Sequence, residues 1–126
     1  MKFQGSILLV DDEAHIRKYV ALILKQLGAT KIVEATNGEG AIAIFQQQKP
    51  DVVLLDISMP LMNGLETLKK LKAIDPESTV IMLTSMVNRQ SIDEALALGA
   101  ANYIRKDNPK EEIAQAIKET IEERFP

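Results

Sequence analysis

Acidic or hydroxyl side chains follow three apolar runs of this chain, and a lysine follows a fourth. Asp11 and Asp12 come after "SILLV", Asp56 after "DVVLL", Thr84 after "TVIML" and Lys106 after "ANYIR". Carboxylates that meet at one place repel one another unless a cation lies between them. Proteins hold Mg²⁺, a hard ion, with one or two carboxylates together with carbonyl oxygens, waters and phosphate oxygens. The residue types therefore favour a magnesium-assisted reaction of a phosphoryl group.

Asp56 is the candidate nucleophile of this set, because carboxylates form aspartyl-phosphate intermediates. The oxygens of a phosphoryl group on Asp56 need neutralising charge, which Lys106 and Mg²⁺ can supply from two sides. The Thr84 hydroxyl can add a hydrogen bond.

Taken singly, the polar residues near the first run have plainer structural roles. Asp12 can cap the first helix, and Glu13 can lie in its first turn, where the helix dipole favours an acid. His15, the only histidine, has the pattern of a solvated helix position.

Short apolar runs alternate along the chain with segments of helical spacing, such as "HIRKYVALILKQL" and "EEIAQAIKETI". The runs have strand length and span residues 6–10, 31–35, 51–55, 79–83 and 101–105. Five repeats of strand then helix predict an α/β fold, with a parallel sheet covered by helices on both faces. In such sheets ligands bind outside the carboxyl ends of the strands, where the candidate residues stand.

Glycine, proline and cap-forming residues mark several helix ends. Gly28 and Gly99 are expected to follow the ends of the first and fourth helices. The fifth helix has the clearest start signal: Asn108 can cap it, Pro109 suits its first position, and Glu111 can complete a capping-box-like pair.

Length and composition are those of an ordinary globular protein. A chain of 126 residues has room for one core, so residues 1–126 are expected to form a single domain. The absence of cysteine excludes disulfides and thiolate metal sites, which fits a cytoplasmic protein. A net charge of -3 gives no electrostatic reason for nucleic acid or an anionic membrane to bind, and no apolar run is long enough to span a bilayer.

The motifs "LLVDDE", "DVVLLDISMPLMNG", "VIMLTS" and "YIRK" resemble, in order and spacing, those of the receiver domain of two-component response regulators, especially its single-domain, chemotaxis-type members. The similarity covers essentially the whole chain, and "DISMPLMNG" is its most specific piece. The resemblance implies a flavodoxin-like fold with three layers, α/β/α, built from five strand–helix units. It also implies a five-stranded parallel sheet with the strand order 2-1-3-4-5.

The same resemblance implies roles for the candidate residues. Asp56 would accept the phosphoryl group. Asp12 would bind Mg²⁺ directly and Asp11 mainly through water, while Asp56 and the Ser58 backbone carbonyl would complete the protein ligands. Lys106 would contact the phosphoryl oxygens.

A switch and two kinds of partner are implied as well. The Thr84 hydroxyl would move toward the phosphoryl group, and the Tyr103 ring would turn inward behind it. The donor would be a histidine kinase, with a small acyl phosphate as a substitute, and the domain would catalyse only its own phosphorylation and dephosphorylation. The surface of the fourth helix, fifth strand and fifth helix would then bind a downstream protein, with the receiver as a monomer or a phosphorylation-dependent dimer.

One position departs from the family pattern. A proline usually follows the lysine through a cis peptide, whereas Asp107 stands there in "KDNPKEE". A cis bond before a residue other than proline costs about 2.5–4 kcal/mol, so either the loop tolerates that strain or it takes another path.

Three other functions share part of the pattern. A Mg²⁺-dependent phosphatase of the haloacid-dehalogenase type also attacks with a strand-end aspartate, but it usually carries a second acid where Ser58 stands. A flavin-binding flavodoxin is disfavoured because the chain has no Trp and no Ser/Thr/Gly-rich loop after the first strand. A pseudo-receiver, which binds partners without phosphorylation, would not need the full set of site residues that this chain has.

Overall fold

The computed structural model describes residues 1–126 and contains five strands that alternate with five helices. In chain order these are β1 (Ser6–Val10), α1 (Ala14–Gln26), β2 (Lys31–Ala35), α2 (Gly38–Gln48), β3 (Val52–Leu55), α3 (Gly64–Ile74), β4 (Thr79–Thr84), α4 (Arg89–Ala97), β5 (Asn102–Arg105) and α5 (Lys110–Arg124). Every predicted strand forms, and its ends agree with the prediction to within one residue. None of the helices combines the length and the apolar character needed to cross a bilayer.

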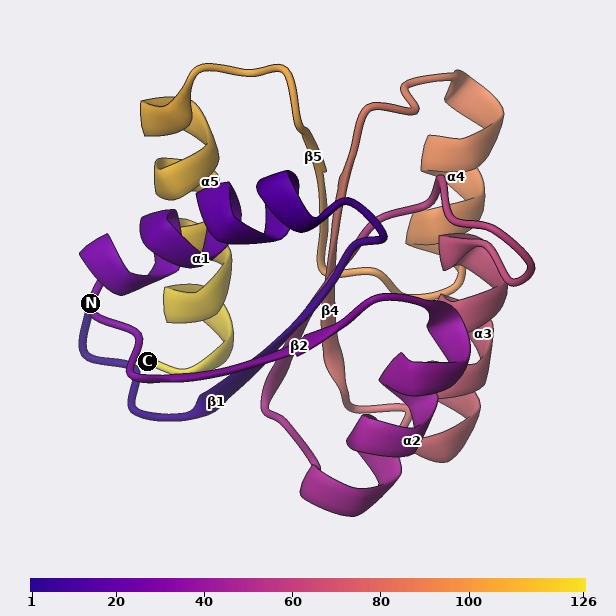
Figure 1. Ribbon diagram of the computed structural model, residues 1–126, viewed down its shortest axis with the longest axis horizontal. Helices are drawn as coiled ribbons and strands as arrows, with labels where there is room; N and C mark the ends of the chain where they lie inside the picture. Colours follow the sequence, from indigo (N-terminus) through magenta and orange to yellow (C-terminus); the bar gives the residue numbers. More distant parts are fainter.

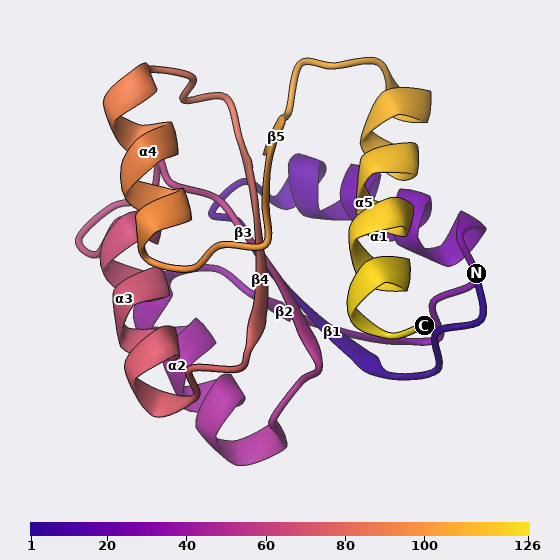
Figure 2. The same cartoon turned by 180° about the vertical axis from the view of Figure 1, so that it is seen from behind.

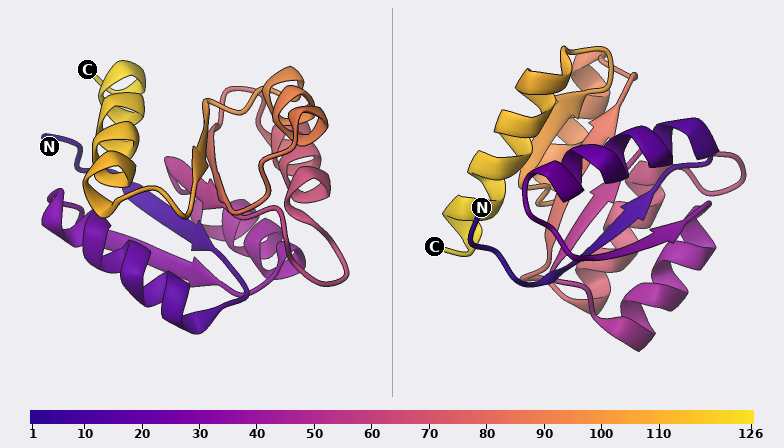
Figure 3. Two further views of the ribbon diagram at one scale, coloured as in Figure 1. Left: turned by 90° about the horizontal axis from the view of Figure 1, so that it is seen from above. Right: turned by 60° about the vertical axis from the view of Figure 1, so that its left-hand side comes forward.

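The strands form one parallel sheet in the order β2-β1-β3-β4-β5, which confirms the predicted order. Helices α1 and α5 lie on one face of the sheet, and α2, α3 and α4 lie on the other (Figure 1 and Figure 2). The view from above in Figure 3 shows the sheet between these two helical layers. The predicted three-layer α/β/α architecture is therefore confirmed, and the carboxyl ends of all five strands point to one edge.

Two apolar cores pack against the two faces of the sheet, because successive side chains of a strand point to opposite faces. Ile7 and Leu9 belong to the core that α1 and α5 cover, whereas Leu8 and Val10 belong to the core on the side of α2, α3 and α4. Every residue of β3 and β4 is buried. This burial on both faces explains why the middle strands read as unbroken apolar runs rather than as alternating patterns.

The ends of α1 and α4 follow the glycine signals. Gly28 and Gly99 have φ angles of 102° and 98°, the left-handed region that favours glycine. The start of α1 differs from the structural role considered for Asp12, because Glu13 occupies the cap position and no side chain makes a cap hydrogen bond. Asp12 is therefore free of any capping role.

The predicted start of α5 is wrong in detail. The helix begins at Lys110, so Pro109 occupies the cap position rather than the first helical one, and no side-chain cap hydrogen bond forms. The N–H of Asn108 donates to the Arg105 carbonyl at 3.3 Å, so Asn108 belongs to the turn after β5. Asn108 and Glu111 consequently form no capping box.

Gly64 begins α3 where this helix passes close to the end of β3. Its N–H donates to the Ile57 carbonyl at 2.9 Å, and a Cβ on residue 64 would overlap the Asp56 carbonyl oxygen. We expect Gly64→Ala to lower the free energy of unfolding by about 3 kcal/mol, because backbone atoms must move to admit the methyl group. Gly40→Ala in α2, where the nearest atom to a Cβ is 3.3 Å away, should change it by less than about 1 kcal/mol. Urea unfolding of both variants checks this, and equal losses would contradict the steric explanation.

Candidate functional site

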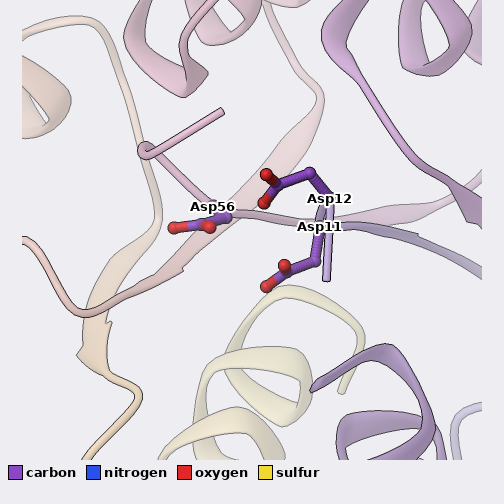
Figure 4. Close-up of side chains that lie close together, drawn as sticks. All are labelled: Asp11, Asp12 and Asp56. Carbon is purple, nitrogen blue, oxygen red and sulfur yellow. The ribbon is translucent and has the colours of Figure 1, made fainter. Parts of the chain in front are cut away.

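Three carboxylates meet at the carboxyl edge of the sheet, as the strand-end pattern predicts. The Asp56 N–H donates to the Val10 carbonyl at 3.1 Å. The Asp11 N–H donates to the Ala35 carbonyl at 3.2 Å, so sheet-type hydrogen bonds hold both backbones in place. Carboxylate oxygens of Asp11, Asp12 and Asp56 lie within 4.8 Å of one another, and Figure 4 shows the three side chains close together. Asp11 and Asp56 are buried, whereas Asp12 is exposed.

Lys106 reaches the two buried carboxylates from the end of β5. Its Nζ lies 2.6 Å from Asp11 Oδ2 and 2.8 Å from Asp56 Oδ2, and the Lys106 side chain is only 11% exposed. The Lys106 N–H donates to the Thr84 carbonyl at 2.9 Å, which continues the pairing of β4 and β5 and places the lysine. Burial alone would lower the pKa of the Lys106 ammonium, but hydrogen bonds to Asp11 and Asp56 and their negative charges outweigh it and raise this pKa.

The raised pKa of Lys106 predicts a loss of stability at alkaline pH. A lysine whose pKa is higher in the folded than in the unfolded state stabilises the fold fully below the unfolded value of 10.5. That contribution disappears as the pH rises through the folded pKa. Burial, and next the charge of Asp56, raise the pKa of Tyr103 as well, which acts in the same direction from 10.0 upward.

We therefore expect the free energy of unfolding to fall as the pH rises above about 10, and to fall less steeply in Lys106→Met. Urea unfolding across this range measures the slopes. Lys69→Met, which removes an exposed lysine of α3, is the control and should keep the wild-type slope. An unchanged slope in Lys106→Met would contradict the assignment.

Backbone N–H groups hold the second oxygen of each buried carboxylate. The Glu13 N–H donates to Asp11 Oδ1 at 2.9 Å, and the Ser58 N–H donates to Asp56 Oδ1 at 3.3 Å. Asp12 and Ser58 are exposed, so this side of the cluster is open to water. Several carboxylate oxygens beside an open face are the ligands that Mg²⁺ takes in proteins, because the ion keeps part of its water shell. The donor set therefore fits the predicted metal.

Thr84 and Tyr103 are connected to each other through Met86, not through the acidic cluster. Thr84 Oγ1 accepts a hydrogen bond from the Met86 N–H at 3.2 Å, and the Tyr103 hydroxyl donates to the Met86 carbonyl. The Thr84 side chain is buried at the sheet edge, as predicted, but it makes no hydrogen bond to Asp56. A movement of the Thr84 hydroxyl would thus disturb the residue whose carbonyl holds Tyr103.

The loop after β5 contains Asp107 at the position where the family usually has a proline. The chain contains no cis peptide bond. The Arg105 guanidinium donates to both carboxylate oxygens of Asp107, at 3.1 and 3.0 Å, and these hydrogen bonds lower the pKa of the Asp107 carboxyl. Of the two possibilities raised by the sequence, the loop takes another path, and Lys106 still reaches Asp11 and Asp56.

The sequence did not indicate Arg17, which contacts the site, or Glu34, which binds Arg17. Arg17 Nη1 donates to the Asp11 carbonyl at 2.7 Å, and Arg17 Nε donates to Glu34 Oε1 at 3.0 Å. The available signal was an arginine near the start of a helix, where the helix dipole disfavours a cation unless a specific contact holds it.

His15 is exposed and lies 3.7 Å from the Glu13 carboxylate, which confirms a solvated helix position.

Comparison of the sequence with known proteins shows a matching family profile and several related chains. The sequence profile of the response regulator receiver domain matches residues 7–118. The chemotaxis protein CheY of Bacillus subtilis is 35% identical over 115 residues, which cover 91% of this chain and 96% of that protein. Sporulation initiation phosphotransferase F of the same organism is 36% identical over 115 residues, which cover 91% of this chain and 92% of that protein.

Solved structures agree with the sequence comparison. Chemotaxis protein CheY4 of Vibrio cholerae has a TM-score of 0.85 at 27% identity, and the match covers 94% of this chain and 99% of that one. A chain of the CheX–CheY–BeF3–Mg²⁺ complex of Borrelia burgdorferi has a TM-score of 0.87 at 28% identity, over 92% of this chain and 88% of that one. The profile match includes the strand ends that bring Asp11, Asp56 and Lys106 together. This chain therefore belongs to the response regulator receiver domain family, and the single-domain CheY proteins are among its relatives.

Proposed function

We propose that this receiver domain takes a phosphoryl group from the phosphohistidine of a histidine kinase onto Asp56 in a Mg²⁺-dependent reaction, and that the phosphoryl group then changes a partner-binding surface. The observation that carries the proposal is the position of the Lys106 ammonium between the Asp11 and Asp56 carboxylates. Buried ion pairs are poor stabilising devices, because the loss of hydration offsets their attraction. A fixed ammonium beside a nucleophilic carboxylate is, in contrast, well suited to neutralise phosphoryl oxygens.

The transfer needs only positioning and charge. An oxygen of the Asp56 carboxylate attacks phosphorus while the bond from phosphorus to the donor imidazole nitrogen breaks, and that nitrogen keeps the electron pair. The Asp56 carboxylate is oriented beforehand, since Lys106 binds one oxygen at 2.8 Å and the Ser58 N–H donates to the other at 3.3 Å. The ammonium of Lys106 is then close enough to turn toward the oxygens of the new acyl phosphate.

Asp11, Asp12 and Asp56, with the Ser58 backbone carbonyl, would hold the Mg²⁺ ion. When bound, the ion neutralises the charge of the carboxylates and of the incoming phosphoryl oxygens. Exposure of Asp12 and Ser58 leaves room on that side for a donor to approach.

The link through Met86 supports a switch. A Thr84 hydroxyl that turned toward a phosphoryl oxygen would give up its hydrogen bond from the Met86 N–H, and Met86 also holds the Tyr103 hydroxyl. Phosphorylation would then rearrange the loop between β4 and α4 and the surface of α4, β5 and α5. We propose this surface as the docking site for a downstream protein; the related CheY of Borrelia burgdorferi forms a complex with CheX.

The mass of the intact protein after incubation with acetyl phosphate and Mg²⁺ tests the proposal. We expect a gain of one phosphoryl group that a chelator abolishes. A phosphatase would instead turn over many equivalents of a phosphomonoester without keeping the group, so p-nitrophenyl phosphate is the second arm. Absence of any mass gain, together with no binding of BeF3 in the presence of Mg²⁺, would overturn the phosphoacceptor role and leave a pseudo-receiver.

A further inference from the structure

We propose that Arg17, held by Glu34, is a positioning residue that sets the orientation of the Asp11–Asp12 peptide, and with it the two carboxylates that would bind Mg²⁺. The inference rests on the proposed function. Arg17 contacts neither carboxylate; its guanidinium reaches the backbone carbonyl of Asp11, and its only acidic partner is Glu34.

The need for Arg17 arises at Asp11, which follows the last residue pair of β1 and β2. In an extended strand the N–H and C=O of one residue point to the same side, and the Asp11 N–H donates to the Ala35 carbonyl of β2. The Asp11 carbonyl therefore also points toward β2, but β2 ends at Ala35. No backbone N–H donates to this carbonyl, and Arg17 Nη1 supplies the missing donor at 2.7 Å. The bond thus satisfies a polar group that the sheet leaves unpaired.

Fixing the Asp11 carbonyl also fixes the start of Asp12. The peptide unit is planar, so the carbonyl of Asp11 and the N–H of Asp12 turn together as one rigid group. The Asp11 side chain has further supports, from the Glu13 N–H and from Lys106. The Asp12 side chain makes no hydrogen bond, so the Asp11–Asp12 peptide is the one fixed element of its position, and its carboxylate turns about its own side-chain bonds from there.

Glu34 keeps the Arg17 guanidinium in one orientation. Its Oε1 lies 3.0 Å from Arg17 Nε, and the Arg17 side chain is only 15% exposed although it lies on the outer helix α1. A planar guanidinium that is held at Nε and at Nη1 cannot rotate freely, so the donor stays aimed at the Asp11 carbonyl. An ammonium can occupy one of these two positions but not both.

The affinity for Mg²⁺, measured by titration of backbone amide shifts in NMR spectra, tests the inference. Arg17→Met removes both hydrogen bonds and keeps most of the apolar stem, and we expect it to raise the Mg²⁺ dissociation constant about tenfold. The amide signals of Asp12 and Glu13 should also shift in the metal-free variant. Arg17→Lys should recover part of the affinity, because one donor remains.

Arg89→Met is the matched control, because it also removes a helical arginine from an ion pair with a carboxylate, the exposed Arg89–Asp93 pair at 3.2 Å. It should leave the Mg²⁺ dissociation constant within about twofold. Should Arg17→Met lower only the free energy of unfolding, with unchanged Mg²⁺ affinity at a temperature where all variants are folded, Arg17 is merely structural and the inference is wrong. If the wild-type protein itself binds no Mg²⁺, the proposed function fails, but the positioning role can still be tested without metal. In that case an Asp12 amide signal that is the same in Arg17→Met as in the wild type overturns the positioning role.

Discussion

Asp56→Asn should abolish the gain of a phosphoryl group from acetyl phosphate and Mg²⁺. The variant lacks the carboxylate that forms the acyl phosphate, and loss of a nucleophile lowers the rate by at least about a thousandfold. The amide has nearly the same size, and its oxygen can still accept a hydrogen bond from Lys106, so the fold should persist. Intact-protein mass recorded over time measures the effect, and a far-UV circular dichroism spectrum verifies the fold.

Asp51 provides the matched control for this experiment, because it precedes β3 at the opposite edge of the sheet. It is exposed and accepts a hydrogen bond from the Ser6 N–H at 2.9 Å. Asp51→Asn should therefore keep the wild-type mass gain. A phosphoryl group that persists in Asp56→Asn and maps to Asp11 or Asp12 would identify another acceptor, and the assignment of Asp56 would be wrong.

The three inner strands of the sheet, β1, β3 and β4, were predictable because burial on both faces requires mostly apolar residues along them. Runs such as "DVVLL" and "TVIML" follow directly from that requirement and gave strand ends correct to within one residue. Strand order is a different matter, since right-handed crossovers of similar length can build several orders from the same runs. The order β2-β1-β3-β4-β5 was implied only by the family resemblance, and the structure confirms it.

The meeting of Asp11, Asp56 and Lys106 was also predictable, because parallel strands deliver their next residues to one edge. The hydrogen bond that Thr84 Oγ1 accepts from the Met86 N–H was not predictable. Strand position determines where a backbone lies, but the rotamer of a hydroxyl depends on the nearest donor, which here is the Met86 N–H. The sequence does not indicate which rotamer Thr84 adopts.

Contacts with the backbone are hard to predict for a related reason. Arg17 bonds to a carbonyl, which every residue has, so no pair of residue types marks the contact. The Arg105–Asp107 pair is the opposite case. Arg105 and Asp107 stand two residues apart where β5 gives way to a turn, and their opposite charges, which the sequence does display, form the bidentate pair at the position of the family's usual proline.

Asp12→Asn should make the metal-free protein more stable than the wild type and the Mg²⁺-loaded protein less stable. Without metal, three carboxylates share the single ammonium of Lys106, and Asp12 adds repulsion while making no hydrogen bond of its own. Two charges about 5 Å apart in water-like surroundings repel by about 1 kcal/mol, which sets the expected gain. With Mg²⁺ at a hundred times its dissociation constant, binding stabilises the wild type by about 2.7 kcal/mol. The variant should lose most of this stabilisation, because the substitution removes a carboxylate that would bind the ion directly.

Urea unfolding in a chelator and in excess Mg²⁺ measures both free energies. Glu123→Gln removes an exposed acid of α5 and should change either value by no more than about 0.5 kcal/mol. A variant that is less stable than the wild type in both solutions would make Asp12 a structural residue and contradict its place in a metal site. Relief of repulsion by itself acts in the same direction at every Mg²⁺ concentration. A reversal of the two stabilities, absent in Glu123→Gln, therefore requires a cation bound at the acidic cluster.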